Sequence, residues 1–284
     1  MTGVAQSGWA ADTSNVEWCE AVTHLYALHP CCAELANTAT NLFAFSAGCV
    51  GLWRAARLGL PVSFVFTEVI ILVVAIGSAI FHATRSYYAE MLDELPMSIM
   101  AIGYVWVLKD KHWLTQPPYW EKFVASYITA VACAWIGYVK YHWYGVFVIC
   151  FTLQVIVAAL ISLDAGPLRL RYLWWYFWLP SILAGKALWE VERHLHRSNQ
   201  CPTSMMNVTW WLHAMWHFFS ALSHSIWMYY AANIPATTRR ALSSSLMSPA
   251  KKGTRSSSRL LPQKRAKSPA RATGSARNRS GASQ

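Results

Sequence analysis

The chain has 284 residues, of which 55% are hydrophobic and only 13% are charged. Because soluble domains carry about 25% charged residues, this composition excludes an ordinary water-soluble enzyme. The net charge of +11 suggests nucleic acid at first, but residues 239–284 hold 12 of the 24 Lys and Arg residues and none of the 13 acids. The rest of the chain is nearly neutral, which argues against nucleic-acid binding and predicts a multi-span membrane protein.

The body of the chain is divided into apolar runs of about 20 residues, the length that crosses a bilayer as a helix. Such runs must be helical because lipid offers no hydrogen bonds to the backbone. They predict an all-α fold, an integral membrane seven-helix bundle. The seven expected spans are residues 36–54, 61–82, 92–109, 121–139, 143–163, 171–190 and 209–232.

The basic residues between the spans predict the orientation of the bundle. If the N-terminus faces away from the cytosol, that side receives only four basic residues of the body, namely Arg85, Lys140, Arg193 and Arg197. The cytosolic side then holds most of the others together with the C-terminal end. By the positive-inside rule, we expect the N-terminus to be lumenal or extracellular and the C-terminus to be cytosolic.

Three regions follow from this pattern: a lumenal segment at 1–35, a seven-transmembrane catalytic domain at 36–232 and a basic cytosolic tail at 233–284. The tail has few large apolar residues, so we expect it to be disordered. Two interpretations of the tail remain open. It either binds the anionic cytosolic leaflet, with about 1 kcal/mol for each basic residue, or stays solvated and only sets the topology.

Ionisable side chains inside membrane spans are costly and mark functional sites. His82 ends the second span, Asp93 begins the third, and His213 and His217 begin the seventh. The second span runs towards the lumen and the other two run away from it. We therefore expect all four side chains at one depth, near the lumenal surface.

The spacing of these residues indicates a metal centre. His213 and His217 are four residues apart, so their imidazoles share one helix face. With His82 they supply three ligands for zinc and leave a fourth position for water, as in catalytic sites. Asp93 can act as a general base, and Ser78 shares a helix face with His82. The pattern favours an intramembrane metal hydrolase.

Simpler explanations exist for each residue when it is taken alone. Two His residues at this spacing are common by chance, Asp93 can cap its helix, and Ser78 can serve close helix packing. Their agreement in depth favours a shared site. For the other ionisable residues in the spans we expect ordinary roles: Glu68 facing water, His224 lining a cavity, and Lys186, Glu190 and Glu192 pairing locally.

Three blocks, spread over residues 17–230, resemble the alkaline ceramidase family. The most specific is Ser78-x-x-x-His82-Ala-Thr, followed by Leu92-Asp-Glu-Leu-Pro-Met97. The others are His213-x-x-Trp-His217 and the N-terminal Glu17-Trp-Cys-Glu20 with Ala33-Glu34. The resemblance implies a membrane amidase of the endoplasmic reticulum or Golgi. Such an enzyme cleaves the N-acyl bond of a ceramide-type lipid to a sphingoid base and a free fatty acid.

The resemblance also assigns roles to individual residues. It implies that His82, His213 and His217 bind zinc, that Asp93 activates the attacking water and that Ser78 steadies the oxyanion. These roles are physically reasonable, because zinc polarises a carbonyl group and one oxyanion donor contributes roughly 3 kcal/mol.

A calcium site near the N-terminus is a further implication of the resemblance. The matching ligands are Glu17, Trp18 through its backbone carbonyl, Glu20 and Glu34. Glu17 stands where the family has aspartate, and Val22 stands where an asparagine ligand is expected. The remaining carboxylates are oxygen donors of the kind that a hard cation such as Ca²⁺ prefers.

The resemblance finally pairs Cys19 with Cys201. Both cysteines are expected on the lumenal side, where disulfides form. Such a bond would tie the N-terminal segment to the loop before the seventh span.

Other functions remain open from the sequence. A related enzyme could run the same reaction in reverse. Seven helices with three histidines are also similar to the adiponectin and progestin receptors, although the expected orientation is opposite to theirs. A transporter or scaffold is a third possibility, for which no inverted repeat of hydropathy is visible.

Overall fold

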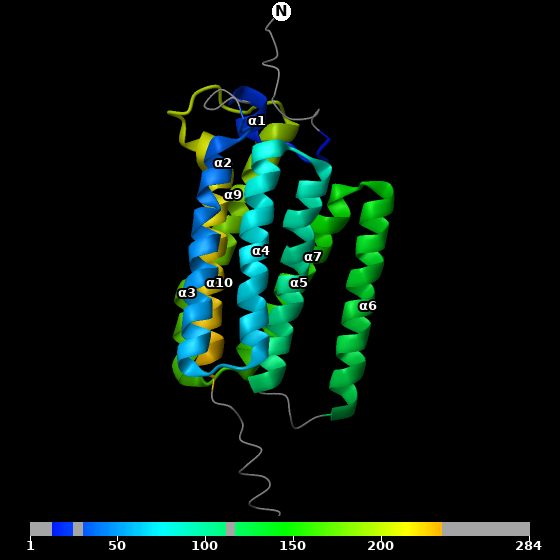
Figure 1. Ribbon diagram of the computed structural model, residues 1–284, viewed down its shortest axis with the longest axis vertical. Helices are drawn as coiled ribbons and strands as arrows, with labels where there is room; N and C mark the ends of the chain where they lie inside the picture. Colours follow the sequence, from blue (N-terminus) through cyan, green and yellow to red (C-terminus); the bar gives the residue numbers. More distant parts are fainter. Residues whose placement is uncertain (1–12, 25–30, 112–116, 235–284) are drawn as a thin grey trace, which may run out of the picture. The chain divides into compact units, whose positions relative to one another are not determined.

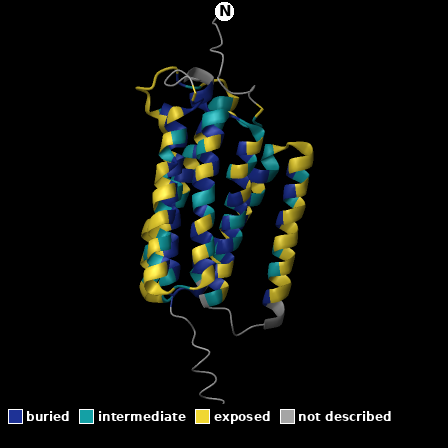
Figure 2. Cartoon of the chain, viewed as in Figure 1, coloured by how far each residue is buried: buried dark blue, intermediate teal, exposed yellow. Residues whose placement is uncertain are grey.

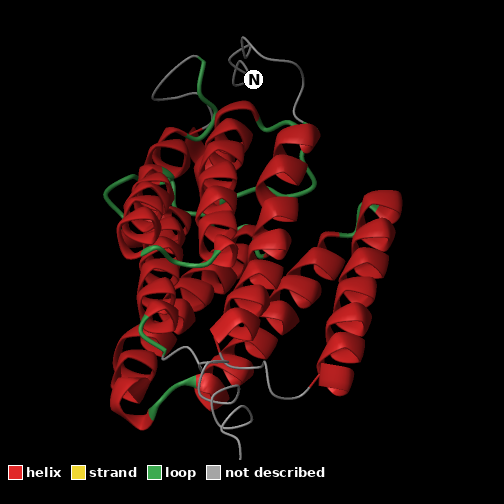
Figure 3. Cartoon of the chain, turned by 60° about the horizontal axis from the view of Figure 1, so that its bottom comes forward, coloured by secondary structure: helices red, strands yellow, loops and turns green. Residues whose placement is uncertain are grey.

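A computed structural model describes residues 13–24, 31–111 and 117–234. Over these residues the chain is helical and contains no strand (Figure 3), so the all-α prediction is confirmed. The basic tail lies outside the described residues from position 235 onwards, as do residues 1–12 of the N-terminal segment.

Within the described residues, four helices are long and apolar enough to cross a membrane. They are α4 (Val62–Thr84), α5 (Tyr87–Lys111), α6 (Pro117–Tyr141) and α7 (Tyr144–Ala165). Large apolar side chains remain exposed on their outer faces (Figure 2), for example Ile136, which is 67% exposed. Exposed apolar surface over whole helices is expected where lipid replaces water as the solvent.

The other three predicted spans fall on interrupted helices. The first is divided at Asn41 into α2 (Leu35–Thr40) and α3 (Leu42–Leu58). The sixth begins with η1 (Leu168–Leu170) and α8 (Arg171–Leu173) and continues through the π-helical η2 (Trp174–Trp178) into α9 (Leu179–Arg197). The seventh contains η3 (Val208–Trp211) and α10 (Leu212–Ala232). These segments are shorter than the four long helices or contain charged residues and histidines. The count of seven spans therefore stays a prediction.

Helix packing brings distant parts of the sequence together. α4 packs against α3 and α5, α10 packs against α9 and α3, and α7 lies between α5 and α6 (Figure 1). Most side chains that face these contacts are buried, and α6 at the edge is the most exposed (Figure 2). The end of α4 and the start of α10 consequently lie at the same end of the bundle.

The N-terminal segment covers that end. The backbone N–H groups of Ala33 and Glu34 donate to the last carbonyl groups of α4, at Ala83 and His82. These bonds satisfy carbonyl groups that have no partner within the helix itself. A disulfide between Cys19, the first residue of α1 (Cys19–His24), and Cys201 joins the segment to the loop that precedes η3.

Candidate metal centre

Three buried histidines meet at the covered end of the bundle. His82 lies in the last turn of α4, and His213 and His217 lie in the first turns of α10. One ligand atom from each lies within 4.8 Å of the other two, and the ring centroids are 4.8 to 5.1 Å apart. When the His, Cys, Asp and Glu side chains of the described residues are compared, these three histidines form the group that can hold a metal ion.

One ring nitrogen of His82 and one of His217 are engaged by other side chains. Nδ1 of His82 lies 2.5 Å from Oε2 of Glu34, and Nδ1 of His217 lies 2.9 Å from the hydroxyl of Thr40. Nε2 of His82 is buried and has no hydrogen-bond partner. Metal-binding histidines use one nitrogen for the metal and the other for a carboxylate or similar partner. The donor set therefore fits a zinc ion.

His213 has a different environment. Its ring stacks on Trp18 with 3.8 Å between centroids, and its Nδ1 is 4.0 Å from Oε2 of Glu192. Glu192 is buried and also accepts a hydrogen bond from the backbone N–H of Cys19. The prediction of local pairing is confirmed for Lys186 and Glu190, whose Nζ and Oε1 atoms are 2.7 Å apart. It was wrong for Glu192, which faces His213.

Asp93 and Ser78 lie beside the histidines. Asp93, in the second turn of α5, lies close to the Ser78 side chain and to the His82 ring. Both residues line a cavity that His213 and His217 also line. The structure thus brings together the five residues that were predicted for catalysis and zinc binding.

Gly77 permits the contact that brings Asp93 to Ser78. A Cβ atom at this position would lie 2.3 Å from the backbone oxygen of Leu92 on α5. Pro96, one turn further along α5, has no N–H to donate to that oxygen. The exposed carbonyl can therefore pack closely against the glycine, and α5 approaches α4 one residue before Asp93.

We expect the Gly77→Ala variant to separate α4 from α5 and to misplace Asp93. Forcing a methyl group against a backbone atom costs about 1–3 kcal/mol, because a backbone carbonyl cannot rotate aside. Thermal unfolding should show the loss of stability, and any enzymatic turnover that depends on Asp93 should fall with it.

Gly137→Ala is the matched control for this substitution. Gly137 is also helical, but nothing lies within 4 Å of its added Cβ. Unchanged stability of Gly77→Ala, or an equal loss in both variants, would contradict a specific role for Gly77.

The cavity beneath the histidines is mostly apolar. Its lining continues down the bundle to Tyr104, His224 and Trp227. Aromatic and aliphatic walls of this kind suit a hydrocarbon chain. The predicted position of His224 in a cavity wall is confirmed.

Glu68 does not face water as expected. It is buried, and its Oε2 lies 2.9 Å from Nε2 of His224, whose Nδ1 lies 2.8 Å from the Tyr104 hydroxyl. A Cβ on Gly51 would lie 2.0 Å from the Glu68 carboxylate carbon, so this glycine makes room for the acid. The sequence offers the two ionisable residues but no sign that they pair.

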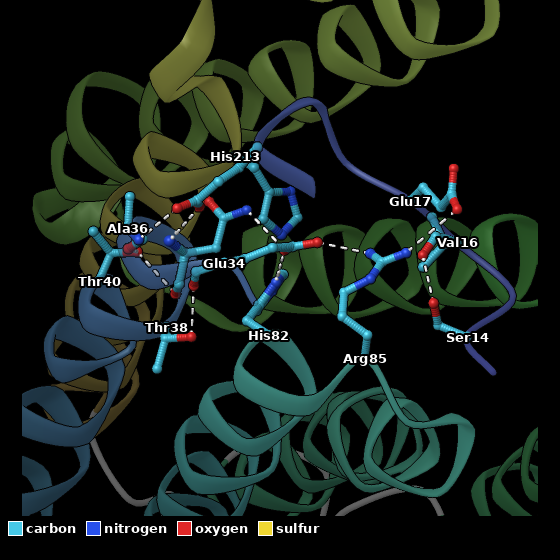
Figure 4. A network of polar contacts seen from close by, with 12 residues as sticks. Ser14, Val16, Glu17, Glu34, Ala36, Thr38, Thr40, His82, Arg85 and His213 are labelled. Carbon is cyan, nitrogen blue, oxygen red and sulfur yellow. Dashed lines mark hydrogen bonds and ion pairs between the residues drawn. The ribbon is translucent and has the colours of Figure 1, made fainter. Parts of the chain in front are cut away.

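The predicted calcium ligands Glu17, Glu20 and Glu34 contact protein donors. Figure 4 shows the Glu34 carboxylate between His82 and Arg85, while Glu17 lies on the other side of Arg85. Glu20 accepts hydrogen bonds from two backbone N–H groups at the start of α2. Burial alone would raise the pKa of Glu34, but Arg85 and His82 hold this pKa at about 2, and the carboxylate is ionised.

Comparison with known proteins gives consistent matches. The family model described as Ceramidase matches residues 10–249. The chain is 26% identical to an alkaline ceramidase of Arabidopsis thaliana, over 78% of this chain and 84% of the relative. It is 25% identical to alkaline ceramidase 3 of Mus musculus, over 75% and 81% of the two chains. It is 31% identical to an alkaline ceramidase of Saccharomyces cerevisiae, over 58% and 53%.

Proposed function

The chain belongs to the ceramidase family, and we propose that it is a zinc-dependent membrane amidase that hydrolyses the N-acyl bond of ceramide. The products are a sphingoid base and a free fatty acid. One observation carries the proposal: three buried imidazoles meet Asp93 and Ser78 at the end of a mainly apolar cavity. The relatives named alkaline ceramidases support the same substrate.

Each imidazole has a definite part in the proposed site. His82 and His217 would hold zinc through Nε2, because their Nδ1 atoms are engaged by Glu34 and Thr40. His213 would supply the third ligand. Zinc held there would supply Lewis-acid chemistry: it would polarise the amide carbonyl and make the attacking water easier to deprotonate.

Asp93 and Ser78 would carry the proton and the developing charge. The Asp93 carboxylate takes one proton from the attacking water and later delivers it to the amide nitrogen, which leaves as the amine of the sphingoid base. The Ser78 hydroxyl donates to the carbonyl oxygen as its negative charge grows. The cavity walls hold an acyl or sphingoid chain and keep bulk water from the reacting atoms.

We further propose seven spans, with the metal centre on the lumenal side of the endoplasmic reticulum or Golgi membrane. The support is that all seven apolar runs fall on helical segments, three of them interrupted, and that the disulfide lies at the histidine end, since disulfides form in oxidising compartments. A glycosylation acceptor fused to the N-terminus should be modified, whereas one at the C-terminus should not.

For the tail we propose binding to anionic lipid, which predicts salt-sensitive vesicle binding.

The receptor hypothesis is less well supported. The family model and the named relatives point to ceramidases, and a receptor does not need a general base beside its metal. Stoichiometric zinc without fatty-acid release would favour the receptor over the enzyme.

Removal of the metal tests the enzymatic proposal. Purified protein in detergent should release fatty acid and sphingoid base from ceramide in equal amounts, measured by mass spectrometry. We expect a zinc chelator to reduce turnover to the background rate and added Zn²⁺ to restore it, because three neutral imidazoles suit Zn²⁺ better than Mg²⁺ or Ca²⁺. Full turnover by zinc-free protein would contradict the proposal.

A further inference from the structure

We propose that the Arg85 side chain supplies the positive charge that the N-terminal carboxylates require. It positions the zinc ligand His82 through Glu34, and it makes the enzyme independent of calcium. The part that concerns turnover depends on the proposed ceramidase function. Arg85 is the C-cap residue directly after α4, and its side chain is only 1% exposed. A buried guanidinium group requires carboxylate partners, and this one lies between two of them (Figure 4).

The contacts of Glu34 use both of its oxygens. Oε1 accepts a hydrogen bond from Nη1 of Arg85 at 2.7 Å. Oε2 lies 2.5 Å from Nδ1 of His82 and accepts a hydrogen bond from the side-chain amide of Asn37 at 3.0 Å. A calcium ion needs six to eight oxygens at 2.3–2.6 Å, and three of the roughly four acceptor sites of this carboxylate are already engaged by protein donors.

Donors also engage the other three predicted calcium ligands. The Glu20 oxygens accept hydrogen bonds from the backbone N–H groups of Ala36 and Asn37, at 2.8 and 2.9 Å. The backbone oxygen of Trp18 accepts a hydrogen bond from the N–H of Ala21. Since position 22 is valine, its side chain brings no oxygen at all.

Glu17 is directed to Arg85 and His196 rather than to the other carboxylates. It lies 3.7 Å from Nη2 of Arg85 and 3.2 Å from Nε2 of His196, and it is 53% exposed. The arginine thus has a buried carboxylate on one side and a half-exposed one on the other. Its charge and its fork of N–H donors suit carboxylates on two sides.

Arg85 reaches the metal centre through one intermediate residue. Glu34 contacts Arg85 with one oxygen and the His82 ring with the other, and its backbone N–H donates to the His82 carbonyl oxygen. Fixing the carboxylate therefore fixes the ring orientation of the zinc ligand. Loss of such an outer partner typically costs 10–100-fold in metal affinity or activity.

The test compares calcium dependence with the effect of removing the arginine. Wild-type protein is freed of calcium by gel filtration in metal-depleted buffer, and its ceramide turnover, zinc content and thermal stability are measured with and without added Ca²⁺. Concentrations should extend beyond about 10⁻³ M, the range of weak calcium sites. We expect all three quantities to remain unchanged by calcium.

Variants at position 85 test the positioning role. We expect Arg85→Leu to lower zinc affinity and turnover by about 10–100-fold, and Arg85→Lys to lie between it and the wild type, because lysine keeps the charge but not the fork. Arg197→Leu is the control, since this exposed arginine lies at the end of α9, at the same end of the bundle. It should behave as wild type.

Two results would overturn the inference. One is a wild-type enzyme that loses turnover or stability on calcium removal and regains it with Ca²⁺. The other is an Arg85→Leu protein with wild-type zinc affinity. If the protein proves inactive on ceramide, the ceramidase proposal fails by itself, whereas calcium titration calorimetry and zinc affinity still decide the role of Arg85.

Discussion

The His217→Ala variant is expected to lose both bound zinc and ceramide hydrolysis. The substitution removes one of three imidazoles whose ligand atoms lie within 4.8 Å of one another. Two remaining histidines cannot complete the three-ligand set of a catalytic zinc site. We expect turnover to fall by more than about 100-fold, beyond the 10–100-fold effect of removing an outer partner. Zinc per chain, measured by mass spectrometry, should fall in parallel.

The loss must be separated from general damage to the fold. His194→Ala is a suitable control, because His194 is an exposed histidine on α9. Thr40→Ala gives an intermediate case: it removes the hydroxyl beside Nδ1 of His217 and leaves all three ligands in place. A His217→Ala protein that keeps zinc and hydrolyses ceramide would remove the basis of the site assignment.

Asp93→Asn is expected to separate catalysis from metal binding. The amide has nearly the same shape as the carboxylate but cannot take the proton from water. Loss of a general base typically costs 10²–10⁴-fold, so we expect kcat to fall by about that factor. Zinc content and thermal stability should stay close to those of the wild type, because Asp93 is not one of the three grouped ligands.

Asp110→Asn, at the other end of α5, controls for the change of charge on this helix. It should leave kcat unchanged. Loss of zinc from Asp93→Asn would assign this carboxylate to the metal instead. Unchanged kcat with full zinc would show that another group accepts the proton.

The meeting of the three histidines at one end of the bundle was predictable from the sequence. The apolar runs give the helices and their direction, and the direction places the end of one helix beside the start of another. His82 on α4 and His213 on α10 are 131 positions apart but meet for this reason. Lipid forces every span to be a nearly complete helix, which makes this part of the fold simpler to predict than a soluble one.

The partners of the histidines were not predictable in the same way. Glu34 lies outside the long helices, and its place over α4 depends on how the N-terminal segment folds back. The sequence identifies it as an acid, and the family resemblance made it a calcium ligand rather than the partner of His82. The pairing of Thr40 with His217 joins residues that are 177 positions apart, and no periodicity indicates it.

The burial of Glu68 shows a second limit. An acid in a span is expected at the water surface unless something offsets the cost of burying it. Here the offset comes from His224 on another helix and from the space that Gly51 leaves on a third. A pattern along one helix contains neither fact, so the prediction for an isolated residue was wrong.

The Cys19–Cys201 disulfide also bears on how the molecule is made. The bond joins positions 182 residues apart, so it can close only after nearly all of the helices have left the ribosome. During biosynthesis the N-terminal segment stays untethered until then, and the three histidines at that end of the nascent bundle are not yet covered by a fixed segment. A host that produces the chain without an oxidative folding pathway would yield a protein whose N-terminal segment is not linked to the loop before η3.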